Sequence, residues 1–570
     1  MTGKAGAASY RGRRITLLGV MLAVVAGLIW RAVDLQILHK EFLQGQGDAR
    51  HLRVVSIPAH RGMITDRHGE PLAISTPVDS IWANPQDLLA ARDEWKQLAK
   101  ALSVNRVWLK ERIERNATRE FVYLKRHVQP ELAEQVMALG IPGVSLQREY
   151  RRYYPAGEVT AHLIGFTNVD DAGQEGLERS FEPVLHGTPG SMRVVKDRLG
   201  RIVETVERIN EPVPGRDLAL SIDRRIQYLA YRELKAAVQA NRAKSGSAVV
   251  LDVRTGEVLA MVNQPAFNPN NRDSLHSDHY RNRAVTDSYE PGSTVKPFTV
   301  AVALESGQYQ PTTLLDTTPG TLRVGPNTIR DVHDYGLIDV TTLIAKSSNV
   351  GTGKLALSLP PEQLWRKFSA MGLGALSGGN IPGEAWGSLP DYHRWYPIDR
   401  VTFSFGYGLS ATTLQLVRAY AALASGGVLK PVSLVPVAQA PEGERVMTDK
   451  IAQQLVTMLE VATSEKGTGS AARVPGYRVA GKTGTVRKSG IGGYAEDSYL
   501  SLFAGMVPAS NPRLAMVVVI NDPRGDEYYG GLVAAPVFGR VMSGALRLLD
   551  VAPDDLPALK PQTVAQVGIL

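Results

Sequence analysis

The stretch that decides the fold is Glu290-Pro291-Gly292-Ser293-Thr294-Val295-Lys296-Pro297-Phe298. Pro291 and Gly292 interrupt the preceding segment, and apolar residues continue to Leu304, so we expect an amphipathic helix to begin near Ser293. Residues three positions apart share a helix face, with Cβ atoms about 5 to 6 Å apart. The Lys296 amine would then reach the Ser293 hydroxyl, and a neutral lysine can take the proton that makes serine a nucleophile.

Two later stretches carry compatible chemistry. A Ser-x-x-Lys tetrad is expected about once by chance in a chain of this length, so it does not establish catalysis alone. Ser347-Ser348-Asn349 lies between apolar, helix-like segments, and residues 479–485 are typical of a strand that ends in Lys482-Thr483-Gly484-Thr485. Gly484 would leave space for a ligand backbone to approach an edge strand. Each stretch taken singly is more typical of an ordinary turn than of a catalytic site.

The chain after Gly215 predicts an α+β domain. Ser221-Ile222-Asp223 offers helix caps, and apolar residues follow at helical spacing to Val238. Five strands are expected, at residues 248–251, 258–262, 477–485, 499–507 and 513–520. A mostly helical block lies between the second and third strands, and residues 536–549 form a final helix. Its sheet would therefore be assembled from both ends of the domain.

An α+β module is expected before that domain, over residues 39–216. Residues 82–84 are typical of a strand, and residues 94–102, 107–115 and 130–139 of amphipathic helices. Two charged stretches, 61–69 and 173–178, indicate salt-bridged turns in a scaffold more than a catalytic site. Pro212, Pro214 and Gly215 mark the boundary, which places the second domain at 217–552 and a Pro-rich, mobile tail at 553–570.

The N-terminus predicts a membrane anchor. Lys4, Arg11, Arg13 and Arg14 precede a weakly polar to apolar run over residues 15–30, which spans about 24 Å as a helix. It reaches membrane thickness if it continues to residue 38 with Arg31 snorkelling. A cleaved signal peptide is the alternative, but no small-x-small site follows the run. We therefore expect a cytoplasmic tail at 1–14, an inner-membrane helix at 15–38, and the bulk of the chain in the periplasm.

Composition excludes several function classes. The chain has 570 residues, 44% of them hydrophobic, and a net charge of +8 that is scattered, so nucleic-acid binding is not indicated. It has no cysteine, which rules out disulfides, thiol catalysis and cysteine metal sites. His276, Asp278 and His279 cluster without a third partner, and a solvated loop is expected there. We predict neither a metal nor a cofactor.

Residues 476–483 match the phosphate-loop pattern letter for letter. A phosphate loop needs a preceding strand and a following helix whose N-terminus receives the phosphates. Here Pro475 stands where the strand should end, and the residues from Gly484 to Gly493 are glycine-rich and polar. We therefore expect no nucleotide site.

Together the three stretches resemble the penicillin-binding proteins, serine D,D-transpeptidases that carry Ser-x-x-Lys, Ser-x-Asn and Lys-Thr-Gly in this order. Ser293/Lys296, Ser347/Asn349 and Lys482/Thr483/Gly484 fill the three positions. The two charged stretches of the first module look like those of the monofunctional class B members, and no Glu-Asp-x-x-Phe stretch of a glycosyltransferase domain is present. The short anchor and Phe405-Gly406-Tyr407-Gly408-Leu409-Ser410 look most like the septal transpeptidase of Gram-negative bacteria.

This resemblance implies a five-stranded antiparallel sheet with flanking helices and a helical subdomain, behind an elongated, dimerisation-type module. It also implies that Ser293 forms an acyl-enzyme with a D-Ala-D-Ala stem peptide, that a stem amine resolves it, and that β-lactams acylate the same serine. Lys296 would be the base, with its pKa lowered by burial and by Lys482. Ser347 and Asn349 would relay the proton, and Lys482, Thr483, Gly484 and Thr485 would face the substrate carboxylate. Further cleft residues would be Tyr407, Arg487, Tyr528 and Tyr529.

Two alternatives also involve acylation of the same serine. One is hydrolysis, as a D,D-carboxypeptidase or β-lactam-hydrolysing enzyme, which differs only in water access to the acyl-enzyme. The other is a division scaffold or β-lactam sensor that does not turn over. Expected partners are peptidoglycan stem peptides, β-lactams, the membrane, a membrane glycosyltransferase and other division proteins.

Overall fold

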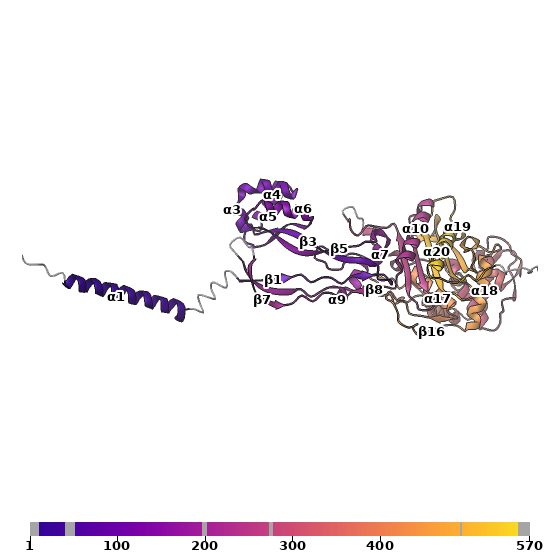
Figure 1. Cartoon of the computed structure of the whole chain (residues 1–570). Coiled ribbons are helices and arrows are strands. Elements are labelled where there is room, and N and C mark those ends of the chain that lie inside the picture. Colours follow the sequence, from indigo (N-terminus) through magenta and orange to yellow (C-terminus); the bar gives the residue numbers. More distant parts are fainter. Residues whose placement is uncertain (1–10, 40–51, 197–201, 273–276, 491–492, 557–570) are drawn as a thin grey trace, which may run out of the picture. The chain divides into compact units, whose positions relative to one another are not determined.

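The computed structural model describes residues 11–39, 52–196, 202–272, 277–490 and 493–556. The chain forms two compact units (Figure 1). The N-terminal unit comprises Met1–His60, Pro77–Arg151 and Gly187–Pro214, and the C-terminal unit comprises Arg61–Thr76, Arg152–His186 and Gly215–Leu570. The domain ranges 39–216 and 217–552 remain predictions.

The expected anchor is helical. Helix α1 (Arg11–Val33) continues as a single π-helical turn, η1 (Asp34–Leu38). The span Gly12–Leu38 has 27 residues and a mean hydropathy of 2.1, which is long and apolar enough to cross a membrane. Residues 1–10 of the predicted cytoplasmic tail lie outside the described residues.

In the N-terminal unit, short helices pack on strands. The helices predicted at 94–102, 107–115 and 130–139 are confirmed, with ends that differ by one residue at most. Each of them buries an apolar stripe, which includes Leu98, Leu109 or Val136. An antiparallel sheet has the order β1 (Leu52–Ile57), β6 (Gly190–Lys196), β7 (Ile202–Asn210). The other elements are β4 (Val122–Val128), β5 (Val144–Tyr153), α3 (Pro85–Ala90), α4 (Trp95–Leu102), α5 (Arg106–Glu114) and α6 (Pro130–Ala138), with β3 (Pro71–Ala83) shared between the units.

The C-terminal unit is built on a five-stranded antiparallel sheet, as predicted. Its order is β10 (Val258–Gln264), β9 (Ser245–Asp252), β19 (Leu514–Asn521), β18 (Gly493–Val507), β17 (Ala480–Gly490). Side chains alternate between faces, so Val250 packs with α10 (Arg224–Ala240) and α20 (Ala535–Leu548), whereas Val249 packs toward the helical block. Both ends of the unit therefore supply the sheet, and β17 is an edge strand.

The helical block covers the other face of this sheet, with α12 (Lys296–Glu305) and α17 (Thr413–Ala424) in the main core. Its other helices are α11 (Arg283–Thr286), α13 (Val340–Lys346), α14 (Asn349–Ser358), α15 (Pro361–Ala370), α16 (Pro397–Ser404) and α18 (Asp449–Thr463). Small strand pairs are β11 (Leu314–Asp316) with β14 (Leu337–Asp339), β12 (Thr321–Val324) with β13 (Asn327–Arg330), and β15 (Val428–Leu429) with β16 (Glu444–Arg445). The remaining short elements are β2 (Ile64–Thr65), α7 (Ala161–Ile164), α8 (Gly176–Ser180), α9 (Glu182–Leu185), β8 (Leu218–Ala219) and α19 (Gly530–Val533).

The two charged stretches of the first module meet inside the C-terminal unit. Arg61 Nη2 lies 2.7 Å from Glu178 Oε2 and 2.7 Å from Glu182 Oε2, and Arg152 Nε lies 2.7 Å from Glu178 Oε1. Arg61 and Glu178 are almost completely buried. A buried carboxylate between two guanidinium groups is compensated, whereas loss of one partner would leave a buried charge alone. Both stretches are thus salt-bridged, as expected.

Candidate active site

Ser293 lies in a tight turn that leads into a buried helix. The 3₁₀ turn η5 (Gly292–Val295) carries Ser293, and α12 begins at Lys296, so the first turn of the predicted helix is 3₁₀ and not α-helical. Pro297 at the start of α12 favours this junction, because its fixed φ suits a first helical turn and its missing N–H is not needed there. Ser293 is half-buried, whereas Lys296 is completely buried.

Glycines let the edge strand β17 and a loop approach this turn closely. A Cβ on Gly292, whose φ is +54°, would lie 2.4 Å from Val486 Cγ2. A Cβ on Gly484 would lie 3.1 Å from Thr294 Cγ2 and 3.3 Å from the carbonyl oxygen of Pro291. The predicted role of Gly484 at an edge strand therefore has a physical basis: the Lys482–Thr485 segment of β17 passes directly against the Ser293 turn.

The Lys296 amine is hydrogen-bonded to the second predicted stretch. Its Nζ lies 2.6 Å from the carbonyl oxygen of Ser347, 3.2 Å from Ser347 Oγ and 2.8 Å from Asn349 Oδ1. Ser347 adopts the left-handed conformation (φ +62°) at the end of α13, and Asn349 is the first residue of α14. The break between these two helices thus turns both side chains toward the lysine.

Lys296 and Lys482 are both completely buried, and they interact electrostatically. Burial lowers the pKa of Lys296 well below its ordinary value; the charge of Lys482 lowers it further, and the charge of Asp331 opposes the shift. Burial also lowers the pKa of Lys482, to about 7. The lowered pKa of Lys296 favours its neutral amine, which is the form that can accept a proton.

Asp331 holds the Ser347–Asn349 break in place, and no sequence pattern predicts this role. Its carboxylate accepts hydrogen bonds from Ser348 Oγ at 2.5 Å, from the Asn349 amide at 2.5 Å and from the Val350 amide at 3.0 Å. A carboxylate at the start of α14 also interacts favourably with the helix dipole. No motif distinguishes Asp331 from neighbouring charged residues, because its partners lie in a different part of the chain.

Lys482, Thr483, Gly484 and Thr485 lie in β17, with Lys482 fully buried. Its amine donates to the Thr483 carbonyl at 3.1 Å and to Thr483 Oγ1 at 3.4 Å. Thr483 Oγ1 lies 2.7 Å from Thr468 Oγ1, and Thr485 Oγ1 accepts from the Gly530 amide at 3.0 Å. Hydroxyls and a cation therefore line this segment of the strand, as an anionic ligand would require.

The predicted cleft residues fall into two groups around β17. Tyr407 packs edge to face with Phe405 and Tyr494, and its hydroxyl is hydrogen-bonded to the backbone of Arg487. Tyr528 stacks on Tyr499 and on Tyr529, with centroid distances of 4.2 and 4.5 Å, and the segment that carries both is tied to Thr485 through Gly530. Arg487 is exposed in β17. These residues flank the strand, and none of them is hydrogen-bonded to Lys296.

The competing motifs do not form sites. Within the phosphate-loop match, Lys482 and Thr483 lie near the start of β17. The chain after them continues as strand to Gly490, so no helix N-terminus follows that could face a phosphate. Among the residues that the structure describes, no group of three His, Asp or Glu side chains is arranged to hold a metal. His276 lies outside the described residues.

Comparison with known proteins agrees with this geometry. Residues 246–543 match the penicillin binding protein transpeptidase domain, and residues 56–220 match the penicillin-binding protein dimerisation domain. The peptidoglycan D,D-transpeptidase FtsI of Escherichia coli K12 is 47% identical over 545 residues, which are 95% of this chain and 92% of that protein.

The similar solved structures include two penicillin-binding proteins. The apo transpeptidase domain of penicillin-binding protein 3 from Burkholderia pseudomallei is 42% identical, with a TM-score of 0.55 over 59% of this chain and 98% of that one. Penicillin-binding protein 3 from Mycobacterium tuberculosis, complexed with aztreonam, is 28% identical, with a TM-score of 0.68 over 88% of this chain and 98% of that one. The chain therefore belongs to the class B penicillin-binding proteins, the monofunctional peptidoglycan D,D-transpeptidases of the FtsI type.

Proposed function

We propose that Ser293 is the residue through which this D,D-transpeptidase cross-links peptidoglycan stem peptides and through which β-lactams inhibit it. The observation that carries this assignment is the buried amine of Lys296, which lies beside the half-exposed Ser293 turn and contacts both Ser347 and Asn349. A serine becomes an effective nucleophile only when a nearby base accepts its proton.

In the first half-reaction, Ser293 Oγ attacks the carbonyl carbon between the last two D-alanines of a stem peptide, and its proton passes to Lys296. The C–N bond then breaks, and the released D-alanine takes a proton that Ser347 relays from Lys296. In the second half-reaction, an amine of another stem peptide attacks the ester, restores the Ser293 hydroxyl and forms the cross-link. General acid–base steps of this kind typically contribute about 10²- to 10⁴-fold in rate.

The other residues would bind and orient the substrate. Lys482, Thr483 and Thr485 would receive the terminal carboxylate, since a buried cation and hydroxyls lie together in this segment of β17. Asn349 would hold the stem amide. By analogy with the family, the backbone N–H groups of Ser293 and Thr485 would form the oxyanion hole, where loss of one donor costs about 10²- to 10³-fold in rate.

A donor thioester that mimics the stem peptide tests this assignment. Wild-type protein with a D-amino acid acceptor should give the aminolysis product, Ser293→Ala should give none, and Ser369→Ala, on α15, should behave as wild type. Free acid without aminolysis product would favour the carboxypeptidase alternative. Undiminished cell-wall cross-linking in cells that carry only Ser293→Ala would favour a scaffold.

We infer in addition that the chain acts at the septum, with α1 in the inner membrane and the C-terminal unit in the periplasm. Arg11, Arg13 and Arg14 precede the apolar span, and positive residues favour the cytoplasmic side. A membrane glycosyltransferase and other division proteins would be its partners, because cross-linking needs freshly polymerised strands. A periplasm-specific reporter fused after residue 556 should be active, and a cytoplasm-specific reporter inactive.

A further inference from the structure

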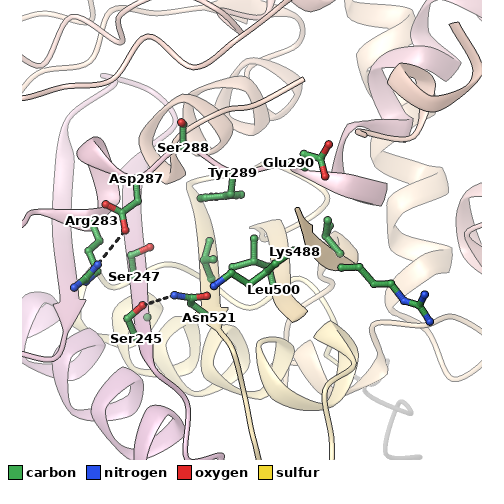
Figure 2. A pocket seen from close by; sticks show the side chains of 14 residues that line it. Ser245, Ser247, Arg283, Asp287, Ser288, Tyr289, Glu290, Lys488, Leu500 and Asn521 are labelled. Carbon is green, nitrogen blue, oxygen red and sulfur yellow. Dashed lines mark hydrogen bonds and ion pairs between the residues drawn. The ribbon is translucent and has the colours of Figure 1, made fainter. Parts of the chain in front are cut away.

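A cavity of about 250 Å³ opens between the segment that leads into Ser293 and the strands of the main sheet (Figure 2). It is smaller than typical pockets for drug-sized ligands, which are about 300 to 1,000 Å³, so it suits one amino-acid-sized group. The polar and charged residues that line it include Ser245, Arg283, Asp287, Glu290, Lys488 and Asn521.

Two polar groups in this cavity have no partner within the described part of the chain. Asn521 Nδ2 donates to Ser245 Oγ at 2.8 Å, which fixes the amide, but its Oδ1 is buried and accepts no hydrogen bond. Lys488 is half-buried, and its side chain extends across the cavity in the direction of Asn521 (Figure 2). A buried carbonyl oxygen without a donor is destabilising, so such groups often mark a position that a ligand or water completes.

The acidic groups of the cavity are already engaged. Asp287 pairs with Arg283 at 3.1 Å, and Glu290 Oε1 accepts from the Gly408 amide at 2.7 Å and from the Tyr494 hydroxyl at 3.0 Å. Lys488 and Asn521 Oδ1 thus offer a ligand a cation and an acceptor, and the exposed Arg487 and Ser288 also line the cavity. The Lys488 cation would bind a carboxylate, and Asn521 Oδ1 would accept from a nearby N–H group. An amino-acid residue with a free carboxylate carries both groups.

The cavity adjoins the nucleophile turn. Glu290 lies three residues before Ser293, and Val486 lines the cavity while contacting the position of Gly292. One side chain thus separates the cavity from the turn that would carry the acyl group. The segment of β17 that would bind the donor carboxylate, Lys482–Thr485, does not line the cavity.

We propose that this cavity binds a carboxylate-bearing amino-acid group of the acceptor stem peptide, with the carboxylate on Lys488 and an adjacent N–H on Asn521 Oδ1. This inference rests on the proposed function, because only a transpeptidase needs a second peptide at the acyl-enzyme. Binding there would hold the acceptor beside the ester without occupying the donor segment of β17.

The full chain in detergent allows the two half-reactions to be measured separately. Acylation is followed with a fluorescent penicillin, and acceptor use is followed as the ratio of aminolysis to hydrolysis of a donor thioester, with a stem tripeptide amine as acceptor. The variants are Lys488→Met, Lys488→Arg and, as a matched charge control, Lys244→Met. Lys244 is exposed, directly precedes Ser245 and does not line the cavity.

We expect Lys488→Met to raise the acceptor concentration for half-maximal aminolysis about 10-fold, in line with the loss of a hydrogen bond to a charged group. Its acylation rate should stay within about twofold of wild type. Lys488→Arg and Lys244→Met should resemble wild type. An acceptor whose carboxylate is amidated should bind wild type about as weakly as the free acid binds Lys488→Met.

Three results would overturn the proposal: unchanged acceptor use in Lys488→Met, an equal loss of acylation and aminolysis, or an effect confined to inhibition by added D-alanine. The last would assign the cavity to the leaving amino acid. Failure of the wild-type protein to be acylated at all would refute the proposed function instead, so the two failures are distinguishable.

Discussion

Replacing Lys482 by methionine should stabilise the C-terminal unit while removing its activity. The lysine is completely buried, and burial lowers its pKa from the ordinary 10.5 to about 7. A charged ammonium group is less stable when buried than in water, so a buried lysine that carries its proton makes folding less favourable. Methionine has a similar shape and no charge, so it should relieve this penalty.

The size and pH dependence of the effect follow from the same pKa. The lowering of the Lys482 pKa from 10.5 to about 7 corresponds to a loss of about 3 to 5 kcal/mol in the free energy of unfolding. This range uses about 1.4 kcal/mol per pKa unit and allows for relaxation of the protein around the charge. The unfolded state binds one more proton than the folded state between pH 7 and 10.5, so wild-type stability rises across this window. The advantage of Lys482→Met is therefore largest below pH 7 and shrinks by about 1.4 kcal/mol per pH unit above it.

Thermal unfolding between pH 6 and 9.5 measures this effect. For a unit of roughly 400 residues, about 2.1 cal/mol/K per residue converts the difference to a Tm about 5 °C higher at pH 6. Lys244→Met, an exposed change, should move Tm by less than about 1 °C. Acylation by penicillin should fall at least 100-fold in Lys482→Met. A lower Tm in this variant, or a Tm difference that does not change with pH, would refute the reasoning.

Four further changes test other parts of the site and fold. Lys296→Arg introduces a guanidinium group that cannot deprotonate near neutral pH, so the rate of penicillin acylation should fall about 10³-fold while Tm changes less. A wild-type acylation rate would exclude Lys296 as the base. Gly292→Ala should lower the acylation rate at least 10-fold, because its Cβ would clash with Val486. Gly307→Ala, also at positive φ but with open space around it, should cost only about 1 kcal/mol of stability. Equal acylation rates in the two variants would contradict the close approach of β17 to the Ser293 turn. Asp331→Asn should slow acylation about 10-fold or more. Asp339→Asn, whose amide oxygen can still cap α13, should leave acylation unchanged and move Tm only slightly. Matching acylation rates in the two variants would remove Asp331 from the positioning role. In thermal unfolding, Glu178→Gln should destabilise the C-terminal unit by about 3 to 5 kcal/mol. Glu465→Gln, which removes an exposed pair with Arg473, should destabilise it by less than about 1 kcal/mol. Similar losses of stability in the two variants would show that the Arg61–Glu178 pair is not buried in solution.

Local patterns were sufficient to predict most of the C-terminal unit. Strands β9 and β10 follow from a short hairpin signal, and α10 and α20 from apolar residues at helical spacing, because burial of one face dictates both periods. The meeting of Ser293, Lys296, Ser347, Asn349 and Lys482 followed from the family motifs. Sequence spacing could not show it, since α13, α14 and β17 are distant from α12 along the chain.

What the sequence could not reveal depends on long-range packing. Asp331 carries no motif, and its role depends on Ser348 and Asn349, which the fold brings to it. The ion pair of Arg61 with Glu178 joins two stretches more than a hundred positions apart. Neither stretch alone indicates which residue of the other will be its ion-pair partner. The orphaned Asn521 Oδ1 is likewise visible only once β19 and β9 are paired.

The most direct test of the central assignment is intact-mass spectrometry of the full chain after brief exposure to penicillin, followed by peptide mapping. One covalent adduct per chain, located on Ser293 and missing in Ser293→Ala, is the predicted result. An adduct on a different residue, or an unmodified mass under conditions where the folded protein is intact, would contradict it.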